Sequence, residues 1–233
     1  MALIEFKNVV KIYGSGEGQQ VAVDNISFSI EEGKFVVILG QSGAGKSTVL
    51  NMLGGMDVPT SGEVLVDGLT VSSMKDKELS HYRAKEIGFI FQFYNLIPSL
   101  TAYENVALTK NIVKDALNGD ELLNMLGLEK QRNKFPSQMS GGEQQRVSIA
   151  RALAKNPKII LGDEPTGALD SQTGIVVLET LQKICKEQHK TVILVTHNAD
   201  IAQCADIVIR MKNAKVVEMK ENLNPVAVSE VSW

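Results

Sequence analysis

Residues 40–48 read GQSGAGKST and follow directly on the apolar run FVVIL at 35–39. The stretch fits the pattern G-x-x-x-x-G-K-[ST], in which glycines let successive backbone N–H groups point into one concavity. The next segment, STVLNMLGG at 47–55, places its apolar residues on one helix face. A buried strand, a glycine-rich loop and a helix in this order predict a phosphate-binding loop, with the helix N-terminus adding a favourable dipole.

Each polar position of this loop has an expected partner on a nucleotide. Lys46 is expected to reach the β- and γ-phosphates, the Ser47 hydroxyl to bind Mg²⁺, and Thr48 to lie near the α-phosphate. The remaining loop residues expected to contact the nucleotide are Gly40, Ser42, Gly43, Ala44 and Gly45. A glycine turn that binds nothing is the alternative, and the flanking strand and helix argue against it.

Two acids follow another apolar run in IILGDEP at 159–165. Ligands of open α/β sheets gather beyond the carboxyl ends of the strands. Asp163 is therefore expected to hold Mg²⁺, directly or through water, and Glu164 to act as the general base on the attacking water. Taken alone, this pattern is usually a solvated strand end, but the phosphate-binding loop makes the functional interpretation the better one.

Two further strands end in polar side chains that carry chemistry. IGFIFQ at 87–92 ends in Gln92, and TVILVTH at 191–197 ends in His197. A lone Gln or His at a strand end is usually structural. Both, however, belong to the predicted sheet that carries Lys46 and Asp163, so all of them can face one crevice. A neutral imidazole there can orient the water and sense the γ-phosphate.

The segment SGGEQQR at 140–146 combines a cap serine, two glycines and the start of a helix that stops at Asn156-Pro157. Ser140 and the N–H groups of Gly141 and Gly142 predict a second anion site. One chain needs a single γ-phosphate site, and the first loop supplies it. The second is therefore interpreted as serving the nucleotide of a partner, with a capped helix that binds nothing as the open alternative.

Composition excludes several other classes of protein. The chain has 233 residues, 44% hydrophobic and 22% charged, with a net charge of −3. This balance lacks the basic footprint of a nucleic-acid binder, so no nucleic-acid partner is expected. No apolar run approaches the roughly 18 residues that span a bilayer, and the N-terminus lacks signal-peptide features. Cys185 and Cys204 fit no metal spacing and are expected to be buried thiols of a reducing cytosol.

The remaining pattern predicts an α/β domain with two additions. Antiparallel strands are expected at 3–13 and 21–30, and a mostly helical insertion at about 93–155, broken at Gly119, Gly127 and Pro136. Strands alternating with helices elsewhere favour a mostly parallel sheet. The further expected strands are the 59–71 hairpin, 158–163, 207–211 and 215–219, and the further expected helices are 76–85 and 170–187. Residues 1–220 are expected to form a single domain, and residues 221–233 a loosely docked tail.

Together these motifs resemble the nucleotide-binding subunits of ABC transporters from residue 2 to about 219. The motifs fall in the order of that family: Tyr13, GQSGAGKST, Gln92, MSGGEQQR, IILGDEP, GALD and His197. Their joint specificity is very high. The resemblance implies an α/β P-loop ABC ATPase core with a mostly parallel sheet, an N-terminal antiparallel β-subdomain and an inserted α-helical subdomain.

The resemblance also implies roles for individual residues. Tyr13 is expected to stack on adenine, and Gln92 to contact Mg²⁺ and relay the nucleotide state to a membrane partner. Asp170, in GALD, is expected at a dimer interface. Two chains should close head-to-tail on two ATP molecules, each with Mg²⁺, and hydrolysis should reopen them. Lys46, Gln92, Glu164 and His197 are the expected catalytic residues.

Three positions depart from the family pattern. Met139 and Glu143 replace the usual Leu and Gln of the signature, although SGGEQQR is common in one branch. The Glu143 carboxylate should weaken anion binding unless it points away or pairs with a base such as Arg146. Gly162 stands where a bulkier residue is usual, and a strand-interior glycine is mildly destabilising.

The segments GFIFQFYNLIPSLTAYENV and DEPTGALDSQTG resemble one subgroup, which includes macrolide-export, lipoprotein-release, antimicrobial-peptide-resistance and cell-division ATPases. This implies a bacterial ATPase at the cytoplasmic face of the membrane, bound to a permease with few membrane helices, with or without an adaptor. The residues expected to receive the permease, about half of which ordinary core packing can explain, are Phe93, Tyr94, Leu96, Ile97, Leu100 and Tyr103.

Two functions remain open at this level. One is a transport ATPase that drives export or extraction of a peptide, drug or lipid-linked substrate. The other is a cell-division-type ATPase that signals through its membrane partner and moves no substrate. A soluble ABC ATPase of DNA repair or translation fits poorly, because such proteins carry two cassettes or long insertions. A P-loop kinase fits worse, since it has no use for SGGE.

Overall fold

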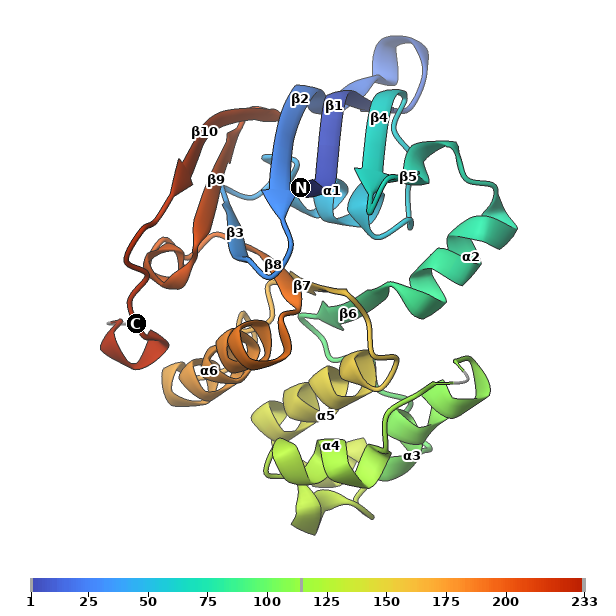
Figure 1. The fold of residues 1–233 in the computed structure, drawn as a ribbon, viewed down its shortest axis with the longest axis vertical. Helices are drawn as coiled ribbons and strands as arrows, with labels where there is room; N and C mark the ends of the chain where they lie inside the picture. Colours follow the sequence, from blue (N-terminus) through green and yellow to red (C-terminus); the bar gives the residue numbers. More distant parts are fainter. Residues whose placement is uncertain (1, 114, 232–233) are drawn as a thin grey trace.

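The computed structural model describes residues 2–113 and 115–231, and two sheets organise this part of the chain (Figure 1). A four-stranded antiparallel sheet has the order β2-β1-β4-β5, and a six-stranded sheet has the order β10-β9-β3-β8-β7-β6. The predicted fold class is confirmed, including the antiparallel N-terminal sheet and the inserted helices. None of the described helices has the length and apolar character needed to cross a bilayer.

The antiparallel sheet is built around β1 (Ala2–Tyr13), which pairs with β2 (Gln20–Glu31) on one side and β4 (Ser61–Val66) on the other. β4 turns through Asp67-Gly68 into β5 (Leu69–Thr70), as the hairpin signal predicted. Phe6 and Phe28 face each other across β1 and β2 and stack with ring centroids 4.6 Å apart. One face of this sheet therefore contributes to a buried core.

The central part of the six-stranded sheet is parallel. Its parallel strands are β3 (Phe35–Leu39), β6 (Ile87–Phe91), β7 (Ile159–Asp163), β8 (Thr191–Thr196) and β9 (Ile207–Lys212). β10 (Lys215–Glu221) adds to β9 in the antiparallel direction. β3 and β8 are buried along their whole length, which explains their continuous apolar sequence.

Successive side chains of the parallel strands point into two separate cores. Phe35, Val37 and Leu39 pack on one side, against α5 (Gly141–Leu153) and α6 (Ser171–Gln188). Val36 and Ile38 pack on the other side, against α1 (Lys46–Leu53) and the antiparallel sheet. The parallel sheet is therefore the middle layer of the molecule, as Figure 1 shows.

The inserted region is helical in its described residues, as predicted. It contains α3 (Ala102–Ala107), α4 (Gly119–Met125) and α5, joined by short 3₁₀ turns. The predicted break at Gly119 falls at the start of α4, where the Asn118 side chain accepts the Asp120 N–H and caps the helix. The insertion lies below the sheet layers in Figure 1 and meets them through α5.

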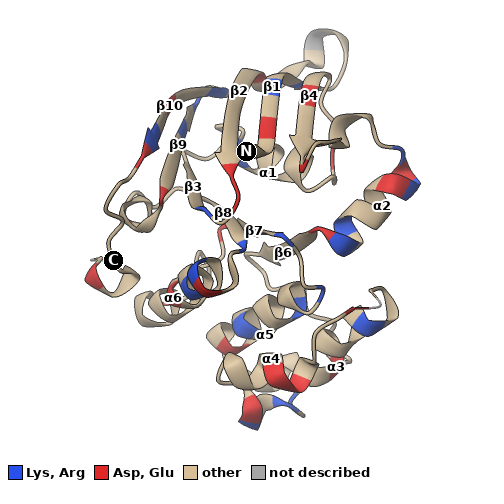
Figure 2. Ribbon diagram, viewed as in Figure 1, with Lys and Arg blue, Asp and Glu red and all other residues tan. Residues whose placement is uncertain are grey.

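Helix α2 (Asp76–Lys85) matches its predicted bounds. It carries acidic residues in its first turn and Arg83 and Lys85 in its last (Figure 2). This arrangement complements the helix dipole. A polar helix of ten residues with little apolar surface is thereby stabilised.

The prediction of a loosely docked C-terminal tail was wrong for its described residues. Val228 and Val231 are 1% and 6% exposed and join the core beside α6. The Gln182 side chain on α6 also donates to the Val226 carbonyl, and the Val226 N–H donates to the Gln203 carbonyl. Two valines three positions apart carry too weak a periodicity for the sequence to reveal this docking.

Candidate active site

Strand register brings the candidate residues to one edge of the parallel sheet. Phe91 pairs with Asp163, Asp163 with Val195, and Leu39 with Thr196. The residues that follow these strand ends consequently lie together at the carboxyl edge. A cleft of about 1420 Å³ opens there. Its lining includes Tyr13, Gly40, Ser42, Gly43, Ala44, Gly45, Lys46, Ser47, Thr48, Gln92, Asp163, Glu164 and His197.

The loop at 40–48 has the backbone that a phosphate cradle needs. Gly45 has φ +97°, and a Cβ built on it would lie 2.3 Å from the Ala22 carbonyl oxygen, so only glycine fits. Lys46 follows as the first residue of α1 and is 7% exposed. Its Nζ donates to the Gln41 carbonyl at 3.1 Å. A buried ammonium has two more protons to donate, which suits it to an anion in the cleft.

Ser47 and Asp163 place hard oxygen ligands beside that loop. The Ser47 hydroxyl donates to Asp163 Oδ1 at 3.1 Å. Burial chiefly raises the pKa of Asp163, with the Glu164 charge adding to it, while Ser47 and Lys46 oppose the rise. No group of three or more His, Cys, Asp or Glu ligands occurs among the described residues. The Ser47 hydroxyl and the Asp163 carboxylate are oxygen ligands of the kind that suits Mg²⁺, which binds through one or two carboxylates and substrate phosphates.

Glu164 is held at both of its carboxylate oxygens. Oε2 accepts a hydrogen bond from the Thr196 hydroxyl at 3.0 Å, and Oε1 lies 2.9 Å from His197 Nδ1. The Glu164 side chain is 18% exposed and that of His197 is 70% exposed. Glu164 also has φ +47°, a strained conformation for a residue with a side chain. This strain, the two contacts and the cleft together favour a positioned catalytic carboxylate.

Thr196 contacts the Glu164 carboxylate, and the sequence interpretation missed it. It is 2% exposed, and its hydroxyl both donates to Glu164 and accepts the Asn198 N–H. Threonine is common in β-strands for its β-propensity alone, so nothing in the sequence distinguished Thr196 as a residue of the site.

We expect Thr196→Val to lower kcat roughly tenfold, because the Glu164 carboxylate loses one of its two fixed contacts. The KM for ATP should stay unchanged, since Thr196 does not line the cleft. Steady-state ATPase kinetics measure both constants. Thr196→Ser should restore kcat, and a loss of kcat in Thr196→Ser equal to that in Thr196→Val would contradict the role of the hydroxyl.

Gln145 is a second residue that the sequence interpretation passed over. It is fully buried on α5, and its Nε2 donates to the carbonyls of Pro165 at 2.6 Å and Phe91 at 3.3 Å. These two residues flank Glu164 and Gln92. One amide of the inserted subdomain therefore connects the ends of β6 and β7. The Gln92 side chain itself lies close to Gly167, where an added Cβ would be 3.1 Å from Nε2.

The SGGEQQR segment at 140–146, called the signature in this family, forms the N-terminus of α5. Ser140 is the cap, and its hydroxyl accepts the Glu143 N–H at 3.3 Å. The Glu143 carboxylate accepts the Ser140 N–H at 2.7 Å and the Gln131 side-chain amide at 2.7 Å. The Ser140 N–H holds the pKa of Glu143 below its usual range, against a partial burial that raises it. Glu143 thus completes a capping box with Ser140. The partners of its carboxylate are Ser140 and Gln131 rather than Arg146.

The signature packs against the GALD segment. Asp170 caps α6 by accepting the Thr173 N–H at 3.0 Å and the Thr173 hydroxyl at 2.7 Å. A Cβ on Gly142 would lie 2.0 Å from the Thr173 methyl carbon, so glycine allows the two helix starts to meet. Neither Asp170 nor any of residues 140–143 lines the cleft described above. The structure therefore groups these candidates apart from the other site residues within one chain.

A glycine-rich loop at a helix start, two acids at a strand end and a Gln and a His on the neighbouring strands define a P-loop ATPase site. The family model described as "ABC transporter" matches residues 23–167. An "Uncharacterized ABC transporter ATP-binding protein MJ1508" of Methanocaldococcus jannaschii is 47% identical over 222 residues, which are 93% of this chain and 99% of that one. The chain belongs to the ABC transporter ATP-binding family.

Other relatives are longer than this chain. "Macrolide export ATP-binding/permease protein MacB" of Mannheimia succiniciproducens is 47% identical over 94% of this chain and 34% of its own length. The "Putative ABC transporter ATP-binding protein MG065 homolog" of Mycoplasma pneumoniae is 43% identical over 99% of this chain. The chain spans half the length of that relative.

Two solved structures have the same fold. A dimer of the ATP-binding cassette MJ0796, in a post-hydrolysis state bound to ADP and Pi, has a TM-score of 0.85 and 45% identity. Another dimeric structure of MJ0796 has a TM-score of 0.86. Each match covers 94% of this chain and 98% of the other. The predicted family and the predicted ATPase class are confirmed.

Proposed function

We propose that this chain is the ATP-hydrolysing subunit of a bacterial ABC transporter that closes as a dimer on two ATP molecules. The observation that carries the proposal is the separation of the signature from the cleft. Ser140 and Gly141 head a capped helix start outside the cleft of their own chain. A head-to-tail partner gives that helix N-terminus a phosphate to bind. The dimeric structures of MJ0796 support this arrangement.

In this proposal, each cleft residue has one task. Lys46 and the loop amides bind the phosphates, and Tyr13 stacks on adenine. Glu164 takes a proton from the attacking water, while His197 and Thr196 hold the Glu164 carboxylate in place. Ser47, Gln92 and Asp163 would hold Mg²⁺, which neutralises charge that develops on the phosphates.

The partner in the membrane is proposed to be a permease with few membrane helices. Phe93 is 75% exposed and Ile97 is 41% exposed on the segment after β6. Leu96 and Tyr103 instead pack against the core, so part of the predicted groove is subdomain interior. Apolar side chains exposed beside Gln92 suit a permease contact that follows the nucleotide state. We propose accordingly that the chain lies at the cytoplasmic face of the membrane.

Export or extraction of a peptide, drug or lipid-linked substrate is the proposed work of the assembly. The similarity to a macrolide export protein over 94% of this chain supports this choice. The exported molecule is selected by the permease, and the ATPase supplies the closing and opening motion.

The test is to tag the chain, extract native membranes gently and identify the proteins that co-purify. A short permease, with or without an adaptor, and ATP-dependent transport in vesicles would establish the export function. A division or wall-remodelling complex that moves no substrate in the same vesicles would replace it with mechanical signalling. Recovery of the chain without any permease would refute both.

A further inference from the structure

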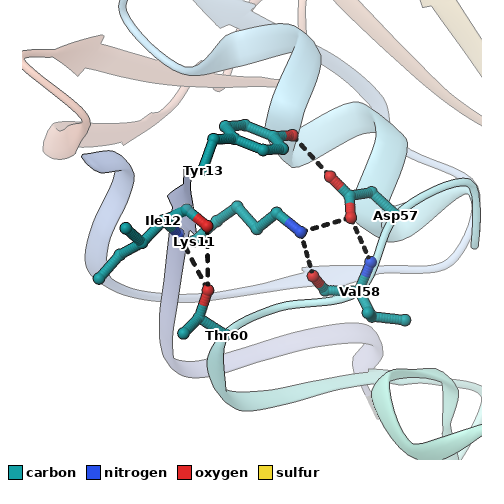
Figure 3. A network of polar contacts seen from close by, with 6 residues as sticks. All are labelled: Lys11, Ile12, Tyr13, Asp57, Val58 and Thr60. Carbon is teal, nitrogen blue, oxygen red and sulfur yellow. Dashed lines mark hydrogen bonds and ion pairs between the residues drawn. The ribbon is translucent and has the colours of Figure 1, made fainter. Parts of the chain in front are cut away.

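Tyr13 lines the cleft and is joined to a network of polar contacts with Asp57, Lys11 and Val58 (Figure 3). Its hydroxyl donates to Asp57 Oδ2 at 2.5 Å. The other oxygen of the same carboxylate, Oδ1, accepts the Lys11 ammonium at 2.5 Å and the Val58 N–H at 2.7 Å. Lys11 Nζ also donates to the Val58 carbonyl at 2.8 Å. Both oxygens of one carboxylate are thus used to connect β1 with the turn after α1.

We propose that Asp57 and Lys11 are positioning residues that fix the Tyr13 ring for stacking on the nucleotide base. The inference rests on the proposed function, in which Tyr13 contacts adenine, and adds the residues that prepare it for that contact. Neither Asp57 nor Lys11 lines the cleft, so both act through Tyr13.

The exposure of Tyr13 is the first reason. Its side chain is 41% exposed at the end of β1 and belongs to neither core cluster. An aromatic side chain without core packing samples several rotamers, and binding must then order it. The bond to Asp57 holds one rotamer before the nucleotide arrives. Preordering one such side chain corresponds to roughly a three- to tenfold gain in affinity.

The position of Lys11 is the second reason. Lys11 and Tyr13 are two residues apart on β1, so their side chains leave the same face of the strand. Lys11 Nζ lies 4.8 Å from the centroid of the Tyr13 ring. The Lys11 side chain is only 12% exposed, and its ammonium occupies one side of the ring. A base is therefore directed to the other side.

The anchoring of Asp57 is the third reason. The Asp57 N–H donates to the Asn51 carbonyl of α1, and the Met56 N–H donates to the same carbonyl. Helix α1 begins at Lys46 in the phosphate-binding loop. Burial opposes ionisation of Asp57, but hydrogen bonds from Lys11, Tyr13 and Val58 hold its pKa below the usual range. The network thus joins Tyr13 to the helix that begins in the phosphate-binding loop.

The test measures binding of ATP and of inorganic tripolyphosphate, which has no base, to the full chain. Tyr13→Phe removes only the hydroxyl, and Asp57→Ala removes its acceptor together with the acceptor of Lys11 and of the Val58 N–H. Each should weaken ATP binding three- to tenfold and leave tripolyphosphate binding unchanged. The double variant should bind ATP no more weakly than the single ones, because both changes break the same contact. A purely structural link would change the two ligands alike.

Lys11→Met should weaken ATP binding in the same way. Lys7→Met is the matched control, because Lys7 lies on the same strand and pairs with Glu5 away from the cleft. Thermal unfolding of each variant reports its fold, and Tyr13→Phe, which retains the aromatic ring but not its bond to Asp57, still tests the proposal should Asp57→Ala unfold.

Tyr13→Ala distinguishes the proposed stacking of Tyr13 on the base from the proposed positioning of Tyr13 by Asp57 and Lys11. If Tyr13→Ala weakens ATP binding but Tyr13→Phe and Asp57→Ala bind it like the wild type, the positioning role is overturned and stacking stands. If Tyr13→Ala itself binds ATP like the wild type, the stacking role fails and the positioning role with it.

Discussion

Glu164→Gln is expected to reduce ATP turnover by roughly three orders of magnitude, because the amide cannot take the proton of the attacking water. ATP binding should persist, since the loop at 40–48, and not Glu164, is proposed to bind the phosphates. The amide oxygen can still accept the Thr196 hydroxyl, so the local structure should stay intact. Phosphate release assays measure turnover, and isothermal titration measures ATP affinity.

The same variant is expected to accumulate as an ATP-bound dimer. With hydrolysis blocked, nothing reopens the proposed clamp, so size-exclusion chromatography with light scattering should show twice the monomer mass in ATP and Mg²⁺. Glu179→Gln is a suitable control, because it makes the same chemical change on the exposed surface of α6. A Glu164→Gln protein that stays monomeric at saturating ATP would rule out the clamp.

The sequence predicts the fold well where periodicity and turn chemistry agree. Continuous apolar runs such as 35–39 and 191–196 are buried strands, because both faces of the parallel sheet are covered. Asp170 caps α6 as its residue type and position predict. The C-terminal docking at Val228 was missed, since a short segment with two buried residues carries little periodic signal.

The cleft residues could be predicted from the sequence because they belong to motifs of fixed spacing. Thr196, Gln145 and Asp57 could not, because their contacts join segments far apart in the chain. The Tyr13–Asp57 bond spans 44 residues, and the Gln145–Phe91 bond spans 54. No local pattern records such a contact, and it appears only once the strands are in register.

The sequence left the position of the Glu143 side chain open. A carboxylate near an anion-binding site is expected to repel the anion. Pairing of Glu143 with Arg146 was one way in which this repulsion could be reduced. The side chain instead turns back to the Ser140 N–H, where it stabilises the start of α5. Gly162 likewise has a local use, because a Cβ there would lie 2.6 Å from a methyl carbon of Leu194.

Lys46→Ala is expected to weaken ATP binding by about two orders of magnitude. The ammonium is the buried cation of the loop, and charge-assisted hydrogen bonds to phosphate contribute about 1.5–3 kcal/mol each. The change also removes a charge that is 7% exposed in the protein without nucleotide. Its removal relieves desolvation as well as breaking the bond to Gln41, so the free energy of unfolding without ATP should change little.

Isothermal titration with ATP and Mg²⁺ measures the affinity, and thermal unfolding with and without ATP gives an independent measure. Ligand that binds only the folded state raises the melting temperature, so the wild type should be stabilised by ATP and Lys46→Ala should not at the same concentration. Lys183→Ala, on the exposed side of α6, controls for loss of a lysine. Wild-type affinity for ATP in Lys46→Ala would contradict the assignment of residues 40–48 as the phosphate-binding loop, because no other lysine follows the glycines at the start of α1.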